Sequence, residues 1–195
     1  MAGYFYLHFA DEPSLALAEA DHDTELGRLV RTGGQISDWD VLRLELGEGV
    51  VVDYLANTFA FRLCSQRLRD VIDRSLSALD VVQWLPVVVK DREQTELPYW
   101  VLHFPEAPSV INMSKSVLYF PDPKVVASRP VVAMDSPTAT DPVVVKACLD
   151  ANLVANRRVF GFPKDSIHLV VAGDVKNEIQ RAECTGMTFS KVPVG

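Results

Sequence analysis

The chain has 195 residues, of which 48% are hydrophobic and 23% charged, and its formal net charge is −7. This composition is typical of a globular protein, and the length suits one domain that buries its core without a disulfide framework. The negative charge disfavours non-specific binding to nucleic acid, which requires a positive field. It fits a soluble protein, and a basic partner would be attracted to it.

The cysteines Cys64, Cys148 and Cys184 are odd in number, and no pair has CxxC spacing. We therefore expect no disulfide framework and a reducing, cytoplasmic location. The first residues, MAGYFYLHFADE, lack the basic segment of a signal peptide. No apolar run approaches the roughly 20 residues that span a bilayer, so we expect no membrane interaction.

Residues 1–32 are expected to form an N-terminal strand followed by an acidic segment. The aromatic run Tyr4–Phe9 predicts the strand, with alternate residues on its two faces. The acidic segment contains Glu19, Asp21, Asp23 and Glu25. One interpretation is a solvated acidic loop, and the other is a surface that binds a basic partner. We predict no metal site at Asp21-His22-Asp23, because adjacent residues rarely converge on one ion without other ligands.

Residues 39–55 have the pattern of a β-hairpin. Val41, Leu44 and Leu46 lead to Gly47-Glu48-Gly49, and three valines follow it. Two glycines permit the positive φ angles that a tight turn requires.

Residues 61–89 predict a strand, a capped helix and a second strand. Ser65 is placed to accept hydrogen bonds at the start of the helix. Leu68, Val71, Ile72 and Leu76 follow a helical spacing that makes one apolar stripe. On the other side, Asp70 and Arg74 can pair at i, i+4. Arg67, Arg69 and Arg74 are either a phosphate-binding patch or, as the interleaved acids favour, a solvated helix face.

A hairpin is predicted from Asp80–Lys90 and Tyr99–Phe104, joined by a polar turn. Pro86 lies inside the first strand and cannot donate to a ladder, which favours an edge position, a bulge or a strand end. The aromatic residues of this hairpin, Trp84, Tyr99, Trp100 and Phe104, are expected in the core.

The second half of the chain is less regular. Residues 105–141 predict a loop-rich excursion with short strands at Ser116–Phe120 and Val131–Met134. The run that begins at Val143 fits either a helix or a strand. Further strands are expected at Arg158–Phe162, Ile167–Val171 and Met187–Val192, with a short helix that Asp174 opens. The last helix and its strands repeat the plan of residues 61–89, as an internal duplication would.

These patterns together predict an α+β protein with a mainly antiparallel sheet and strand–helix–strand units in a single domain, residues 1–195. They reveal no catalytic constellation. No serine lies in a G-x-S-x-G elbow, and the histidines are scattered. Cys64, near a helix start, could in principle react with His103 as its base. No cofactor is predicted.

From about Gly33 to Val192 the chain resembles a family of bacterial immunity proteins that are encoded beside polymorphic toxins. The matching segments, in the family's order, are GGQISDWD, VVDYL, LCSQRLRDVI, DVVQWLPVVV, LPYWVLHF, RVFGF, LVVAGDVKNEI and TGMTFSKV. Gly161 stands where relatives tend to carry a basic residue, and Ala172-Gly173 stand where a serine cap is common. The resemblance implies a protein without catalytic residues that neutralises a toxin by binding it.

Two hypotheses follow for the function. The first is an immunity or inhibitor protein whose acidic segment, Glu19 to Glu25, attracts a basic effector such as a nuclease. The second is a module that binds a small or regulatory ligand in an apolar pocket lined by Trp84, Tyr99 or Trp100.

Overall fold

The computed structural model describes residues 3–19, 33–119, 143–163 and 168–195. The chain divides into two compact units. The larger unit consists of Met1–Ser109 and Asn156–Lys191, and the smaller unit of Val110–Ala155 and Val192–Gly195. The interpretation of residues 1–195 as a single domain, with a boundary near residue 33, stays a prediction.

The described part of the chain contains two helices and a larger set of short strands, which confirms the α+β class. In chain order the elements are β1 (Tyr4–Phe9), β2 (Ala18–Glu19), β3 (Leu42–Leu46), β4 (Tyr54–Leu55), β5 (Leu63–Ser65), α2 (Gln66–Ser75), β6 (Gln83–Lys90), β7 (Glu96–His103), β8 (Val117–Tyr119), β9 (Val143–Lys146), β10 (Val159–Phe160), β11 (Leu169–Ala172), α4 (Gly173–Arg181) and β12 (Met187–Val192).

A six-stranded sheet in the larger unit has the order β2-β3-β6-β7-β5-β4. Its centre is the predicted hairpin, in which β6 and β7 pair antiparallel from Gln83↔His103 to Lys90↔Glu96. However, β3 runs parallel to β6, so this sheet is mixed. The prediction of a mainly antiparallel sheet is therefore confirmed only in part.

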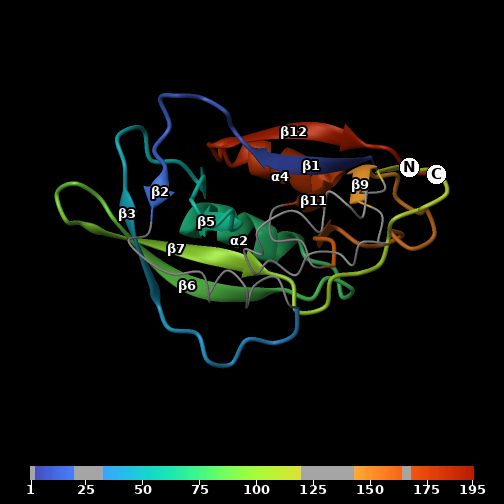
Figure 1. Cartoon of the computed structure of the whole chain (residues 1–195), viewed down its shortest axis with the longest axis horizontal. Helices are drawn as coiled ribbons and strands as arrows, with labels where there is room; N and C mark the ends of the chain where they lie inside the picture. The colour runs from blue at the N-terminus through green and yellow to red at the C-terminus, as the bar shows by residue number, and fades with distance from the viewer. Residues whose placement is uncertain (1–2, 20–32, 120–142, 164–167) are drawn as a thin grey trace, which may run out of the picture. The chain divides into compact units, whose positions relative to one another are not determined.

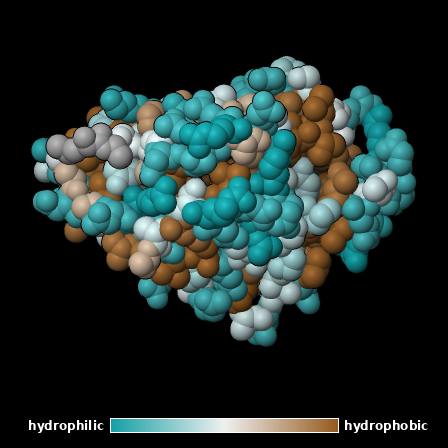
Figure 2. All heavy atoms as spheres, turned by 180° about the vertical axis from the view of Figure 1, so that it is seen from behind, coloured by the Kyte–Doolittle hydropathy of each residue, from teal (hydrophilic) through white to brown (hydrophobic). Residues whose placement is uncertain are grey.

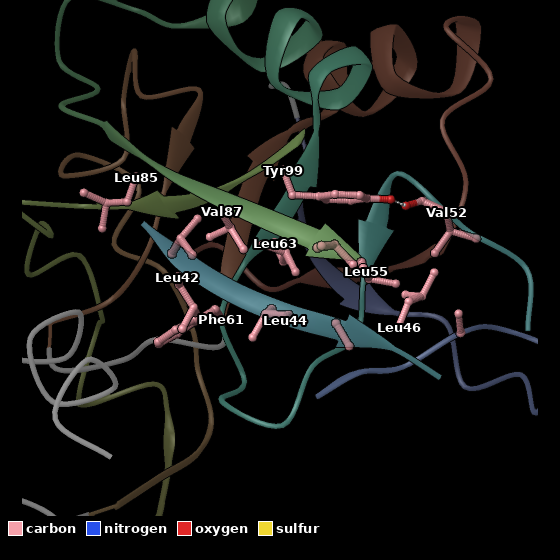
Figure 3. Packing of buried hydrophobic residues seen from close by; sticks show 14 of the residues in the cluster. Leu42, Leu44, Leu46, Val52, Leu55, Phe61, Leu63, Leu85, Val87 and Tyr99 are labelled. Atoms are coloured by element: carbon pink, nitrogen blue, oxygen red, sulfur yellow. Dashed lines mark hydrogen bonds between the residues drawn. The ribbon is translucent and has the colours of Figure 1, made fainter. Parts of the chain in front are cut away.

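The main hydrophobic core lies on one face of this sheet (Figure 3). Alternation along the strands directs Leu42, Leu44 and Leu46 of β3 to the core, and each of them is at most 9% exposed. Tyr99 is also buried there, and its hydroxyl donates a 2.6 Å hydrogen bond to the carbonyl of Val52. A buried tyrosine needs such a partner, because an unpaired hydroxyl in the core costs free energy.

A four-stranded sheet, also in the larger unit, has the order β10-β11-β1-β12. Helix α4 packs against its strands β1 and β11, whereas α2 packs against β5 and β7 of the other sheet. The two helices contact each other, so both lie between the sheets (Figure 1). Each presents an apolar stripe: Leu68, Val71 and Ile72 are buried on α2, as are Val175 and Ile179 on α4.

The two strand–helix–strand units are confirmed in their element order. The first comprises β5, α2 and β6, and the second β11, α4 and β12. In neither unit do the two strands pair directly: β7 lies between β5 and β6, and β1 lies between β11 and β12. Both units thus share an arrangement in which a third strand separates the strands that the helix connects.

The hairpin expected across residues 39–55 is wrong. The strand β3 exists, but its neighbours are β2 and β6, and β4 lies at the opposite edge of the sheet. The valines after the glycine turn meet a different segment, since Val50 forms a parallel bridge with Leu15. At Gly49 a Cβ atom would come within 2.6 Å of the backbone nitrogen of Ala16, which shows how closely these segments approach.

Pro86 is not at an edge, because β6 lies between β3 and β7. Its missing N–H is nevertheless not needed. The pairing of β3 with β6 begins at Leu42↔Val87, so Pro86 lies just outside that ladder. Its carbonyl accepts a 2.8 Å hydrogen bond from the indole of Trp39 in the segment before β3. The sequence could not show where the neighbouring strand ends.

The smaller unit contains the antiparallel pair β8 and β9, whose register is irregular between Val117 and Leu118. The undecided run at Val143 is thus a strand. Leu149 forms bridges with Ile111 and with Val194 near the C-terminus. Buried residues of this unit include Val110, Leu149 and Val154. The strand expected at Val131–Met134 lies outside the described residues.

Gly186, which precedes β12, lies where an added side chain would both clash with its neighbours and strain the backbone. Its φ is +86°, and a Cβ atom would lie 2.5 Å from Val52 Cγ2 and 2.7 Å from the Tyr54 carbonyl oxygen. We expect Gly186→Ala to lower the free energy of unfolding by about 3 kcal/mol, combining overpacking with left-handed strain.

The control is Gly34→Ala, because Gly34 has a φ of +81° with nothing within 4 Å of the added atom. This variant should cost only about 1 kcal/mol, the conformational part alone. Urea denaturation of both variants measures the difference, and equal costs would contradict the close packing at Gly186.

Candidate functional site

The start of α2 is organised by the buried carboxylate of Asp53, which is 6% exposed. Ser65 caps the helix by accepting from the N–H of Leu68 at 3.3 Å, as predicted, and its hydroxyl donates to Asp53 at 2.6 Å. Arg67 donates to both oxygens of the same carboxylate, at 3.0 and 2.5 Å. The backbone N–H of Thr185, before β12, donates to it at 2.8 Å.

These donors determine the charge state of Asp53. Burial raises the pKa of this carboxyl, but the hydrogen bonds from Arg67, Ser65 and Thr185, together with the charge of Arg67, lower it by more. The net direction is a pKa below the ordinary value, so the group stays ionised in the native protein. We interpret this network as structural, since all its members satisfy one another.

Arg69 lies on another side of α2, between two tryptophans. Its guanidinium carbon is 4.9 Å from the ring centre of Trp100 and 5.6 Å from that of Trp84. The indole of Trp84 donates to Asp73 at 2.7 Å, and Asp73 also faces Arg69 at 3.6 Å. The tryptophans therefore hold a protein cation, whereas Tyr99 is buried in the core with a bonded hydroxyl.

Arg74, unlike Arg67 and Arg69, lines a pocket of about 450 Å³. The lining residues are Val71, Arg74 and Ser75 of α2, Arg158 before β10, and Glu178, Arg181 and Ala182 at the end of α4. The expected pair of Arg74 with Asp70 is wrong, because Asp70 instead accepts from Gln66. The three arginines of α2 thus have different surroundings and do not form one patch.

None of the three aromatic residues proposed to line a ligand pocket lines this one. The sequence missed its actual composition because the residues come from three separate segments. The only local signal was Arg74, since Arg158 and Arg181 had no pattern that linked them to it.

Cys64 and His103 do not form a catalytic pair. Cys64 is opposite Trp100 in the register of β5 and β7, and His103 is three residues further along β7. Successive residues of a strand face opposite sides, so the two side chains lie on opposite faces of the sheet. Burial also raises the pKa of the Cys64 thiol, against the lowering expected near a helix start. The ring of His103 bonds the carbonyl of Gly34 at 2.8 Å.

The acidic segment is described only at its first residue. Glu19 is exposed on β2 and lies directly opposite Glu45 in the register with β3. Asp21, Asp23 and Glu25 lie outside the described residues, as does the sequence Asp21-His22-Asp23. Over the described ranges, no group of three or more potential metal ligands comes together. None of the described helices is long and apolar enough to cross a membrane.

The Asp53 network predicts that the stability of the wild-type protein is acid-sensitive, and a variant at this position tests that. Asp53→Asn should lower the free energy of unfolding at neutral pH by about 2 to 3 kcal/mol, the usual range for hydrogen bonds to a buried charge. Because the native pKa lies below the unfolded value, the carboxylate stabilises the fold fully above the unfolded pKa. That contribution disappears as the pH falls through the native pKa.

The variant should therefore lose less stability than the wild type between about pH 5 and pH 3. Urea denaturation across this range measures the effect. Glu96→Gln is a control, because Glu96 pairs with Arg43 between half-exposed side chains and should cost below about 1 kcal/mol. If Asp53→Asn lost as much stability on acidification as the wild type, Asp53 would not be the source of the acid sensitivity.

The cysteines give a second prediction. Cys64 and Cys148 are buried, and burial raises the pKa of the half-buried Cys184 to about 11. At neutral pH we expect iodoacetamide to leave Cys64 and Cys148 unmodified and to label Cys184 slowly, because the thiolate is the reactive form. Mass spectrometry of the native and the urea-unfolded protein checks this. Labelling of native Cys64 at the rate of the unfolded chain would revive it as a nucleophile.

A comparison with known families matches residues 11–194 to the model described as Immunity protein family (Imm11). The match begins well before Gly33, so the family region includes the acidic segment and not only residues 33–192. The curated proteins gave no match. Since the family model covers nearly the whole chain, the protein belongs to the Imm11 immunity protein family.

Proposed function

We propose that this protein acts in the cytoplasm as an immunity protein that binds and neutralises a toxin encoded beside it. The observation that carries the proposal is the family match over residues 11–194. Such a protein acts by binding and needs no catalytic residues of its own. The separation of Cys64 from His103 on opposite sheet faces agrees with that.

The edge of the six-stranded sheet at β2 is the surface that we assign to the toxin. Glu19 and Glu45 are like charges directly opposite each other, an arrangement that destabilises a strand pair. Lys90 lies opposite Glu45 on β6 and offsets part of this repulsion, and a basic partner would offset the part at Glu19. The acidic residues Asp21, Asp23 and Glu25 follow Glu19 closely in the sequence.

Exposed aliphatic side chains accompany this edge. Leu17, Val50 and Val51 are 39%, 59% and 45% exposed, and their segments lie side by side because the Gly47 N–H bonds the Leu17 carbonyl. Hydrophobic residues also reach the surface among hydrophilic ones in the space-filling view (Figure 2). Apolar groups next to charged ones are typical of protein interfaces, with an apolar core and a polar rim.

The basic test is co-expression. Cells that produce the toxin of the neighbouring gene should grow only when this protein is present, and the two purified proteins should form a complex. Protection without complex formation would overturn the proposed mechanism, and a complex without protection would overturn the immunity function.

The acidic residues can be tested by association kinetics. Replacing Glu19, Asp21, Asp23 and Glu25 together by Lys should slow association with the toxin about tenfold or more at low salt, because electrostatic steering is lost. The difference should shrink as salt screens the charges. Biolayer interferometry at several salt concentrations provides the measurement.

The matched control reverses four exposed acidic residues elsewhere, Asp38, Asp40, Glu93 and Glu106. Both variants have the same net charge. If both slow association equally, net charge alone matters and the assignment of the β2 edge is wrong.

The α2–α4 pocket favours a second candidate function, a module that binds a small ligand. It does not have the apolar character first expected, since three arginines line it. A toxin-binding protein can also carry such a site, so the two functions do not exclude each other.

A further inference from the structure

The pocket between the ends of α2 and α4 has the size of a ligand site. Its volume of about 450 Å³ falls within the range of small-molecule sites, roughly 300–1,000 Å³. Val71 and Ser75 are each 3% exposed. Arg74, Glu178 and Arg181 are exposed, so charged side chains surround a buried floor.

The charge of the lining is opposite to that of the protein. The chain has a net charge of −7, yet the pocket is lined by three arginines and one glutamate. Arg158 is paired with Asp174 at 2.7 Å, and Arg181 is paired with Glu178 at 2.5 Å. Among the described residues, nothing forms an ion pair or a hydrogen bond with the guanidinium of Arg74.

A second unused donor belongs to Arg158, one of the residues that line the pocket. The Nε of Arg158 is shielded from solvent and has no acceptor among the described residues. Its backbone N–H is held by the carboxylate of Asp80 at 3.1 Å, and its Nη2 by Asp174. The pair with Asp174 orients the guanidinium, while the Nε donor stays unsatisfied. A buried donor without an acceptor costs free energy. Because Nε is shielded even from water, a ligand would contact the exposed part of the Arg158 side chain, which is 33% of its surface.

Helix electrostatics explain only part of this arrangement. Arg74 and Arg181 lie in the last turns of their helices, where cations complement the negative end of the dipole. Arg158 belongs to neither helix, so this reason does not apply to it. Its placement beside the other two adds a guanidinium to the lining that the helix ends do not require.

We propose that the pocket binds a small molecule that carries a phosphate group, with Arg74 and Arg158 as the direct donors. Guanidinium groups match the oxygens of phosphate in charge and geometry. Donors from two different elements suit a tetrahedral group with several oxygens better than one planar carboxylate. Arg181 is 71% exposed and its pair with Glu178 is weak in water, so it can turn to the ligand as well.

Inorganic phosphate is the probe that tests this inference. Titration of the full-length protein at constant ionic strength, followed by NMR of the arginine Nε–H groups, should give saturable shifts for Arg74 and Arg158. Acetate and chloride should give none that saturate. Arg74→Gln should weaken phosphate binding about tenfold, the effect of one charge-assisted hydrogen bond.

Arg92→Gln is the matched control. Arg92 is an exposed residue of the β6–β7 turn that pairs with Glu48, and its replacement removes the same charge. It should leave the affinity for phosphate unchanged. Arg74 is exposed, so its replacement should not disturb the fold, and circular dichroism checks this. Linear shifts, equal saturation with acetate, or equal weakening in both variants would each overturn the inference. The immunity function is tested separately and does not depend on this result.

Discussion

The carboxylate of Asp53 joins the parts of the larger unit that the chain keeps far apart. It lies just before β4, and it receives hydrogen bonds from the start of α2 and from the segment before β12. The adjacent backbone strengthens the junction, since the N–H of Tyr54 donates to the Thr185 carbonyl at 3.1 Å. Gly186 fits against Val52 and Tyr54 without room for a side chain. The position of α2 relative to the four-stranded sheet depends on this junction.

The placement of the pocket follows from the same junction. Its residues come from the end of α2, the end of α4 and Arg158, so its shape depends on how the two helices meet. Asp53 anchors α2 at its start, whereas Asp174 in the first turn of α4 binds Arg158. One ion pair at the start of α2 and another in the first turn of α4 thus help to orient the two helices that line the pocket. The buried carboxylate of Asp53 and the exposed one of Asp174 each orient an arginine.

Sequence reasoning succeeded where one segment contains the whole signal. The cap at Ser65, the stripe of α2 and the β6–β7 hairpin each rest on residues close in the chain, and the structure has all three. It failed where the structure of a segment depends on pairing with residues far away in the chain. The turn at Gly47-Glu48-Gly49 looked like a hairpin because the pattern could not show that Val50 meets Leu15. Pro86 suggested an edge position, a bulge or a strand end, because the sequence could not show that the pairing with β3 begins only at Val87.

The net negative charge of the chain and the positive charge of the pocket arginines act over different distances. The net charge of −7 acts on a partner before contact, over a distance of the Debye length, about 8 Å at physiological salt. The arginines of the pocket act mainly by direct contact, because Asp174 balances the charge of Arg158 and Glu178 that of Arg181. A large polyanion would be repelled by the rest of the surface before it reached them. A small anion carries fewer charges and meets less of this repulsion, so the surrounding acidity would favour a small anion over a polyanion. An acidic exterior and a basic pocket are therefore compatible in one protein, and the two proposed ligands, a basic macromolecule and a small anion, would be attracted to different parts of it.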